Sequence, residues 1–405
     1  MPTPPPRHLS RQQAVQEALT HNPAIAAARE QVAEAKAGIA LATALPDPSL
    51  VTEIDQERNY FSPGSGSERD LGVQFTVPFP FRTHLNGKIA RGSWQVAQFA
   101  LTQLKEQIAS QTAQAYDAVQ VAIRHREDLM ESKKISAQFL EKSQMRFQAG
   151  TVPKLDTLKA KVDLAKAEND LIANERMIAT SRSGLNRRLG RSLSITVEEL
   201  DPLDVPVTVP DLPILEQLAS SARPELRSMM AQRKAAHDSL TLARNYWAPD
   251  LNITLWHSDI TGQPGTYRFD GGITFPLFFW QHEKGQVAQA EHHEMELTAT
   301  QSDLFAQVML DLNNSHATAI IAWRQAIFLR DQLLPEAHEA FNTTFTSYSL
   351  GGSSTLDLLD AKSTLLAAES QYTDALGAVN DAVADLERAV GGPLPAIAAG
   401  ISHEK

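Results

Sequence analysis

The sequence of 405 residues contains no cysteine. Disulfide bonds and thiolate metal sites are therefore excluded, and so is a lipid anchor on a cysteine of this sequence. The start of the chain, from Met1 to Ser10, is rich in proline and lacks the apolar core of a secretory signal peptide. We therefore expect a mature chain from which a leader has been removed.

Long apolar runs and basic stripes are also missing. No stretch of about 18 apolar residues occurs, so the sequence predicts no transmembrane helix, and a part that crosses a membrane would have to be built of β-strands. The net charge of −11 and the lack of a basic stripe exclude nucleic acid as a partner. Aromatic residues make up only 6% of the chain, and alanine, glutamine, leucine and glutamate dominate long stretches, which is typical of long helices.

Catalytic motifs are absent as well. The sequence has no G-x-S-x-G, no P-loop, no H-E-x-x-H and no glycine-rich dinucleotide-binding turn. The acid pair Glu198-Glu199 lies in sequence typical of a linker. We therefore expect a protein that is not an enzyme and that needs no cofactor.

The most informative feature that is present is an internal duplication. With a shift of 201 residues, AGTVPKLDTLKAKVDLAKAE around Gly150 matches LGGSSTLDLLDAKSTLLAAE around Gly351, and Asn22-Pro23 matches Arg223-Pro224. A match of this length and order is far beyond chance, so we expect two tandem repeats. Residues that are identical at matched positions include Leu155 and Leu356, Asp156 and Asp357, Lys161 and Lys362, and Glu168 and Glu369.

Each repeat contains two short segments in which apolar and polar residues alternate, which is the pattern of strands with one apolar face. These segments are 49–56 and 70–77 in the first repeat and 250–257 and 267–275 in the second. Loops rich in glycine, serine and proline, 57–68 and 258–266, connect them. A small soluble hairpin would explain any single strand, but four strands at duplicated positions with aromatic flanks favour a transmembrane β-barrel.

Helical patterns fill most of the remaining sequence. Helices that start at proline are expected at 23–44 and 224–246. Much longer helical patterns follow the strands, and about sixty helical residues span roughly 90 Å, more than an ordinary globular domain needs. We expect two long antiparallel hairpins, in which turns at 146–153 and 347–354 join 84–145 to 154–189 and 282–346 to 355–390.

The expected fold is therefore mainly α with a small β part. Its predicted divisions are a first repeat at 1–190 with the hairpin 84–189, a linker at 191–222, a second repeat at 223–391 with the hairpin 282–390, and a tail at 392–405. Four strands cannot close a membrane barrel, because about eight is the smallest number. Open edges in lipid would leave backbone groups unpaired. We therefore expect a homotrimer with a 12-stranded barrel and a helical tunnel.

Several of these motifs resemble a known family. The opening LSRQQAVQEALTHNPAIAAAREQVAEAKAGI and the duplicated turns of pattern Gly-x₄-Leu-Asp-x-Leu-x-Ala resemble the TolC-type outer-membrane factors, from about Leu9 to Gly392. The resemblance implies an outer-membrane channel with a periplasmic helical extension. Such a channel is the exit duct of a tripartite efflux pump or a type I secretion system. It passes small molecules or metal ions that an inner-membrane pump delivers through a periplasmic adaptor protein.

The resemblance also assigns the two hairpin turns to periplasmic tips that contact the adaptor. The tip residues are Arg146, Gly150, Thr151, Val152, Tyr348, Gly351, Gly352 and Ser353. The archetype of the family carries a basic residue soon after the second tip glycine, which helps to lock the closed aperture. Here the stretch is Gly352-Ser353-Ser354, so we expect the closed state to be held differently.

In such channels, aspartates just after the second tip ring the closed aperture. Asp357 and Asp360 fall on these positions, and Asp156 takes the equivalent place in the first repeat. The i, i+3 spacing places Asp357 and Asp360 on one helix face. Three copies would then present a ring of acids that favours cations and repels itself when closed. The alternative is a solvated helix face on which Asp357 only caps the helix.

Aromatic residues after the strands are candidates for the girdle at the interface with outer-membrane lipid. They are Phe79, Phe81, Phe278, Phe279 and Trp280.

Two features bear on metal ions. The segment ALPDPSL, which ends at Leu50, resembles the heavy-metal branch of the family, which exports cobalt, zinc and cadmium or copper and silver. His292 and His293 do not form a chelating pair, because adjacent helical residues point about 100° apart. We therefore predict no metal site in the protein.

A soluble periplasmic coiled-coil adaptor or scaffold is the rival interpretation. An adaptor should carry one helical hairpin inserted in a β-rich lipoyl-like unit, whereas this sequence predicts two hairpins and few strands. Membrane fractionation separates the two interpretations, since a channel requires detergent for extraction.

Overall fold

The structure is a computed structural model that describes residues 8–56, 67–195, 199–204, 209–259 and 265–394. Several segments discussed above lie outside the described residues. They are the start of the chain, most of the two loops between the strands, parts of the predicted linker, and the tail from residue 395 onward.

The chain forms two compact units, and each takes segments from both repeats. One comprises 1–27, 102–223 and 306–405 and is termed the helical unit, and the other comprises 28–101 and 224–305 and is termed the sheet unit.

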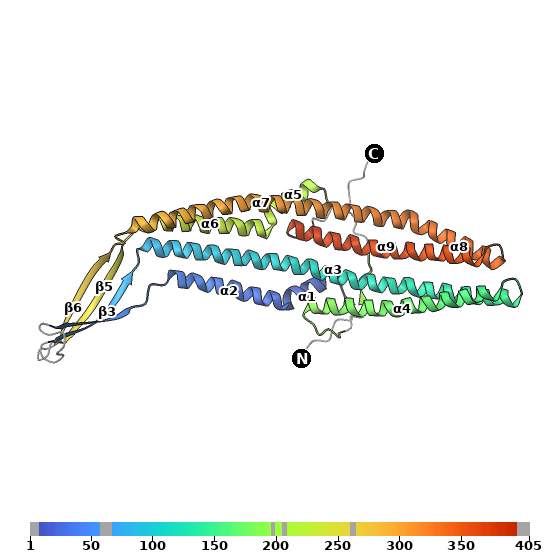
Figure 1. Ribbon diagram of the computed structural model, residues 1–405, viewed down its shortest axis with the longest axis horizontal. Coiled ribbons are helices and arrows are strands. Elements are labelled where there is room, and N and C mark those ends of the chain that lie inside the picture. Colours follow the sequence, from blue (N-terminus) through green and yellow to red (C-terminus); the bar gives the residue numbers. More distant parts are fainter. Residues whose placement is uncertain (1–7, 57–66, 196–198, 205–208, 260–264, 395–405) are drawn as a thin grey trace. The chain divides into compact units, whose positions relative to one another are not determined.

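The sheet unit is built around four antiparallel strands. They are β2 (Ser49–Gln56), β3 (Ser67–Val77), β5 (Asp250–Asp259) and β6 (Thr266–Thr274), in the spatial order β2-β3-β5-β6 (Figure 1). The first strand pair thus lies beside the second, as expected if the two repeats contribute equally. The helices α2 (Pro23–Thr43) and α6 (Pro224–Arg244) precede the two strand pairs. The bounds of the four strands differ from the predicted ones by three residues at most.

The two faces of this sheet differ in polarity, because successive side chains of a strand point to opposite faces. One row of paired residues across all four strands is Leu50, Val73, Leu255 and Phe269. Leu50, Leu255 and Phe269 are at least half exposed in this row. The next row is Val51, Gly72, Trp256 and Arg268. The first row belongs to an exposed apolar face, and the second to a polar face that also carries Asp70, Asn252 and Asp270.

The helical unit consists of long helices and a small parallel bridge. Two short strands, β1 (His8–Leu9) and β4 (Glu199–Leu200), pair in parallel. Three helices have residues in both units, namely α2, α3 (Pro80–Gln148) and α7 (Phe279–Phe328). The other helical elements are α1 (Arg11–His21), α4 (Lys154–Leu189), α5 (Leu212–Ala222), the π-helical turn η1 (Leu329–Leu333), α8 (Leu334–Leu350) and α9 (Thr355–Val390).

The helical pattern predicted over 282–346 contains one proline, Pro335, and the structure departs from a regular α-helix just before it. The helix changes to a π-helical turn at Leu329–Leu333, in which the amide of Leu334 donates to the carbonyl of Leu329, five residues earlier. Pro335 follows directly. Its ring would collide with the carbonyl of residue 331 in a regular α-helix, and the wider π-turn relieves that collision. Three elements were not predicted from the sequence, namely α1, and β4 and α5 within the segment 191–222.

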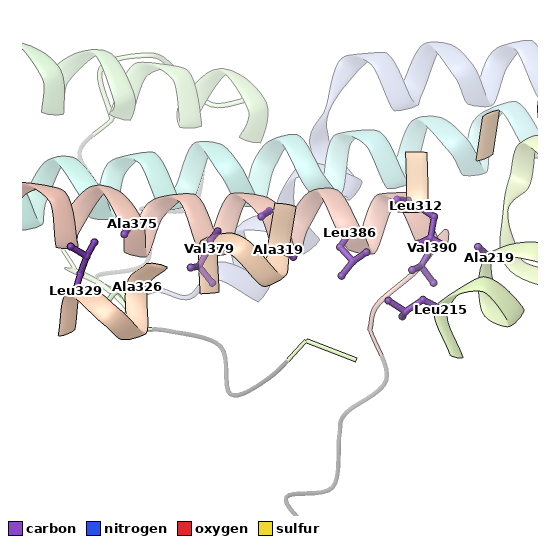
Figure 2. Packing of buried hydrophobic residues seen from close by; sticks show 13 residues of the cluster. Leu215, Ala219, Leu312, Ala319, Ala326, Leu329, Ala375, Val379, Leu386 and Val390 are labelled. Carbon is purple, nitrogen blue, oxygen red and sulfur yellow. The ribbon is translucent and has the colours of Figure 1, made fainter. Parts of the chain in front are cut away.

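The core of the helical unit is rich in alanine. Figure 2 shows side chains from α5, α7, η1 and α9 in one buried cluster, among them Ala319, Ala326, Val379 and Leu386. Small side chains let helix backbones approach closely, and each buried leucine contributes about 1.5–3 kcal/mol. The alanine-rich composition of the sequence thus serves close helix packing rather than a large aromatic core.

The ends of the two return helices repeat the same local geometry. Gly190 ends α4 with a φ of 71° and Gly391 ends α9 with a φ of 86°, a left-handed conformation that favours glycine. A Cβ at Gly190 would lie 2.8 Å from the carbonyl oxygen of His21, and one at Gly391 would lie 3.2 Å from Cα of Arg223. Each glycine therefore packs against the junction of two shorter helices, α1 and α2 for Gly190 and α5 and α6 for Gly391.

Candidate functional site

Both hairpin tips in the helical unit close with the same turn. Gly150 and Gly351 adopt φ values of 72° and 90°. The amide of Thr151 donates to the carbonyl of Arg146 at 2.9 Å, and the amide of Gly352 donates to that of Ser347 at 2.8 Å. Such bonds over five residues are typical of helix ends with a left-handed glycine. The two predicted tips are therefore copies of one turn.

Arg146 of the first hairpin reaches the second tip. Its Nη1 donates to the carbonyl oxygen of Tyr348 at 2.9 Å, and its guanidinium carbon lies 4.6 Å from the centre of the Tyr348 ring. That ring is fully buried and meets the edge of Phe139, with ring centres 5.5 Å apart. The structure thus brings together two residues that the sequence placed on separate tips. A cation is present at the second tip, although the first hairpin supplies it.

The other residues of the two tips differ in how closely they are packed. Val152 is half-buried and Ser353 shares a hydrogen bond of 2.6 Å with the hydroxyl of Ser347. A Cβ at Gly352 would lie 2.9 Å from the Ser347 hydroxyl oxygen, whereas one at Gly150 would meet nothing within 4 Å. The second tip is therefore the more tightly packed of the two.

The predicted aperture aspartates lie at the starts of the return helices. Asp357 is exposed and forms a capping box with Ser354, because its amide donates to Ser354 Oγ at 3.2 Å and its Oδ2 accepts from the Ser354 amide at 3.0 Å. These hydrogen bonds lower the pKa of the Asp357 carboxyl. Asp360 is exposed one turn later, and Asp156 is half-buried at the start of α4. The capping role considered as an alternative for Asp357 is present, and its carboxylate still faces solvent.

Sequence reasoning missed a buried ion pair of the helical unit. Lys362 on α9 is only 4% exposed, and its Nζ donates to Asp163 Oδ2 on α4 at 2.6 Å and to the hydroxyl of Ser136 on α3. Further along, Thr373 donates to Asp128 at 2.8 Å, and His125 lies 2.9 Å from Asp374. These contacts between α9 and the first hairpin are termed the α9 seam. The only signal in the sequence was the Ala-Lys pair shared by the two repeats.

Carboxyl groups face one another along the α9 seam. Burial, and then the charges of Asp128 and Glu131 on α3, raise the pKa of Glu369 to about 7, against the opposing effect of Arg124. Burial, and then the charges of Asp117 and Asp385, raise the pKa of Asp381 to about 6. The charge state of the seam therefore changes between mildly acidic and neutral pH.

The predicted interface aromatics lie where strands of the sheet unit pass into helices. Phe79 is 44% exposed between β3 and α3, and Phe278 and Trp280 are exposed with ring centres 5.6 Å apart. Phe81 is half-buried, and Phe279 begins α7. Nearby, Arg82 pairs with Asp250 at 3.1 Å and donates to the Tyr246 carbonyl at 2.8 Å. This arginine, which the sequence did not single out, fixes the start of α3 to the start of β5.

Metal ligands do not converge in the part of the chain that the structure describes. No group of three or more histidine, aspartate or glutamate residues there could hold a metal ion. His293 lies 3.1 Å from Glu296 on its own helix, in a simple surface pair. Among the described helices, none combines the length and apolarity needed to cross a membrane.

Comparison with known proteins decides the family. The model of the outer membrane efflux protein family matches the chain twice, over residues 14–191 and 215–392. The chain belongs to this family. It is therefore an outer-membrane efflux channel of the kind that serves tripartite efflux systems, and the family is not enzymatic. Channels of this family form trimers and carry a helical periplasmic domain. The double match also coincides with the duplication found in the sequence.

Individual relatives of this efflux channel are distant. The cobalt-zinc-cadmium resistance protein CzcC of Cupriavidus metallidurans is 24% identical over 379 residues, which cover 91% of this chain and 86% of CzcC. The outer-membrane channel OprN superposes with a TM-score of 0.80 at 16% identity, over 94% of this chain and 90% of OprN. The outer membrane protein VceC of Vibrio cholerae gives a TM-score of 0.79 at 18% identity, over 95% of this chain and 96% of VceC. The structural likenesses establish the fold.

Proposed function

We propose that three copies of this channel protein join their sheets into one 12-stranded barrel, and that the hairpin tips form its periplasmic aperture. The exposed apolar face of the sheet supports this arrangement, since lipid would cover it. Three copies would bring Asp357 and Asp360 together around one axis, with Asp156 nearby. The aromatic residues Phe79, Phe278 and Trp280 would then lie at the membrane interface.

One observation supports this proposal above all. Two exposed carboxylates lie beside the second tip, and Arg146 of the first hairpin binds that tip. Asp357 and Asp360 point away from the protein interior at the start of α9, while Arg146 binds the last turn of α8 through Tyr348. Arg146 would thus replace the basic lock that is missing after Gly352. The acids would set the charge of the aperture, and Arg146 would hold its closed position.

A charge substitution that keeps the helix cap tests the aperture. Asp357→Asn retains a side-chain oxygen that can accept from the Ser354 amide but removes the charge, and it is combined with Asp360→Asn. In planar lipid bilayers, we expect the double variant to lose most of the block that multivalent cations impose from the periplasmic side. Asp385→Asn, near the other end of α9, is the matched control. Unchanged block in the double variant removes both aspartates from the aperture.

We further propose that the two tips bind the helical hairpins of a periplasmic adaptor, which links the channel to an inner-membrane pump. Leu350 at the second tip is 85% exposed, and such an exposed apolar side chain at the end of a hairpin favours contact with a partner. A photo-crosslinking residue at Leu350 or Thr151 should capture the adaptor. The same residue at Leu41, which is equally exposed on α2 of the sheet unit, should not.

For the cargo we propose metal ions rather than drugs. The likeness to CzcC over most of both chains supports this proposal, and so does the ALPDPSL segment before β2. The test is growth of a strain that lacks this channel in cobalt, zinc or cadmium salts and in hydrophobic drugs. We expect the strain to be sensitive to metals alone. Sensitivity to drugs alone would refute metal ions as the cargo, but it would not contradict the function as an efflux channel.

A further inference from the structure

The polar face of the sheet carries a charge cluster that none of the roles above uses. Arg268 on β6 lies 3.5 Å from Glu53 on β2, 3.5 Å from Asp70 on β3 and 3.2 Å from Asp270 on its own strand. Its guanidinium carbon also lies 5.3 Å from the centre of the Trp256 ring on β5. All four strands therefore contribute to one cluster around a single arginine.

The backbone is adapted to this cluster. Gly72, Trp256 and Arg268 occupy one row across β3, β5 and β6. A Cβ at Gly72 would lie 2.6 Å from Cε3 of Trp256, so glycine is required for the ring to lie flat over β3. The flat ring is then in place to support the guanidinium, which aromatic faces attract.

The negative charges of the cluster are not fully matched. Three carboxylates face one guanidinium. Asp70 is only 7% exposed, its Oδ2 points at Arg268, and its Oδ1 has no hydrogen-bond partner among the described residues. A buried carboxylate oxygen without a donor leaves negative potential directed into the cluster. The site is thus built to attract a further cation rather than to be neutral.

The apolar face of the sheet indicates where the polar face points in the assembly. The other face exposes Leu71, Leu255, Phe269 and Ile273, which suits lipid, so the polar face turns toward the enclosed pore. This step rests on the proposed assembly of three sheets. In that assembly the cluster would occur three times around the pore, where low-dielectric walls focus the field of fixed charges.

We propose that Glu53, Asp70 and Asp270, with Arg268 at their centre, form a second charge filter of the channel, which favours cationic permeants and whose strength Arg268 limits. This filter lies in the sheet unit and is separate from the aspartates of the hairpin tips. Removal of Arg268 leaves three carboxylates unopposed and strengthens the filter. Removal of an acid from the cluster weakens it.

The test measures ion selectivity after the tip acids have been removed. Full-length trimers with Asp357→Asn and Asp360→Asn are placed in planar bilayers across a KCl gradient, and the reversal potential gives the ratio of K⁺ to Cl⁻ permeability. Added Arg268→Gln should raise this ratio about tenfold, because the loss of one unit charge about 6 Å from the permeant in water favours K⁺ about threefold and disfavours Cl⁻ about threefold. Asp270→Asn and Glu53→Gln should each lower it. All three changes should fade in 1 M salt, where the Debye length falls to about 3 Å.

The charge-conserving variant separates electrostatics from folding. Arg268→Lys should restore the original permeability ratio, and heat-resistant trimers on gels verify assembly of every variant. If Arg268→Gln does not assemble, the two acid variants still decide the question. Conducting channels whose ratio does not respond to Arg268→Gln or to the acid variants overturn the filter. A permeability ratio in Arg268→Lys that is as high as in Arg268→Gln also overturns it. Trimers that never conduct would instead refute the proposed channel assembly.

Discussion

The two hairpins derive from one duplicated pattern but use it differently. Both close with the same left-handed glycine turn, and both return helices span 36 residues and end at a left-handed glycine. The first arm of the first hairpin is one unbroken helix, α3, whereas the first arm of the second hairpin consists of α7, a π-turn and α8. The first tip starts its return helix at Pro153 without a side-chain cap, and the second uses the Ser354 capping box.

Identical residues at matched positions have acquired different roles. Lys161 is exposed on α4, but its counterpart Lys362 is buried in the α9 seam. Glu168 forms a half-exposed pair with Lys133 at 3.1 Å, but its counterpart Glu369 is half-buried and has a raised pKa. The difference arises because α9 packs against the first hairpin and buries many more of its side chains than α4. Duplication therefore conserves backbone geometry, whereas the packing partner decides what each side chain does.

The lysine pair offers the largest expected effect. Lys362→Met leaves Asp163, which is only 16% exposed, without its cation, and the loss of one partner of a buried ion pair costs about 3–5 kcal/mol. Lys161→Met, at the matched exposed position, should change the stability by less than about 0.5 kcal/mol. Amide hydrogen exchange of α9 in the two variants measures the difference. Similar protection in both variants would contradict the structural role given to Lys362.

Loss of the contact between the two tips should have the second largest effect. Arg146→Ala removes a charged hydrogen bond and a cation–π contact with Tyr348, together about 2–4 kcal/mol. We expect faster hydrogen exchange at 345–352 and a higher conductance in bilayers, because the second tip is no longer held by the first. Arg126→Ala, on the exposed side of the same helix, is the control. Wild-type conductance in Arg146→Ala would mean that the contact only stabilises the turn.

Much of this comparison was readable in the sequence, because it depends on local patterns. The alternation at 49–56 and the helical patterns gave the strands and hairpins to within a few residues, and Gly150 and Gly351 marked the turns, since a left-handed helix end requires glycine. Such signals act within a few positions along the chain. The duplication then supplied the second copy of each element.

What could not be read depends on which helices pack together. Lys161 and Lys362 each follow an alanine within the same helical pattern, so the sequence cannot tell which lysine is buried. The contact of Arg146 with Tyr348 joins residues 202 positions apart, and no local pattern announces it. The π-turn also escaped detection, because the apolar periodicity continues on both sides of Pro335.

Glu369 predicts a pH dependence of the stability of the second hairpin. The carboxyl of Glu369 has a pKa raised from 4.5 to about 7 in the folded protein, so its contribution to stability is complete below the unfolded value and is lost as the pH rises through about 7. The groups that face it are Asp128, Glu131 and Arg124 on α3 and His338 on α8.

Substitution of each glutamate separates the two hairpins. Glu369→Gln imitates the protonated form, so it should remove most of this pH dependence and raise the melting temperature above pH 7 by about 2–4 °C. Glu168→Gln, at the matched half-exposed position, is the control variant. Thermal unfolding followed by circular dichroism from pH 4.5 to 8 provides the measurement. An unchanged slope in Glu369→Gln would assign the pH dependence to Asp381 or to other groups.

The interrupted ascent of the second hairpin gives the smallest expected effect. Pro335→Ala restores an amide that can donate to the carbonyl of residue 331, so the π-turn at Leu329–Leu333 loses the steric reason for its width. Because Leu329 is buried in the core cluster, a return to regular α-helix would rotate the residues on one side of it. We therefore expect the gain in helix propensity and the loss in packing to cancel within about 1 kcal/mol. In Pro335→Ala, the rate of hydrogen exchange should change only at residues 329–335. The matched substitution Lys134→Pro lies in α3, which has no π-turn to accommodate the ring, so it should lower the stability of the protein by about 3 kcal/mol or more. Equal effects of the two substitutions would show that the π-turn does not accommodate the proline.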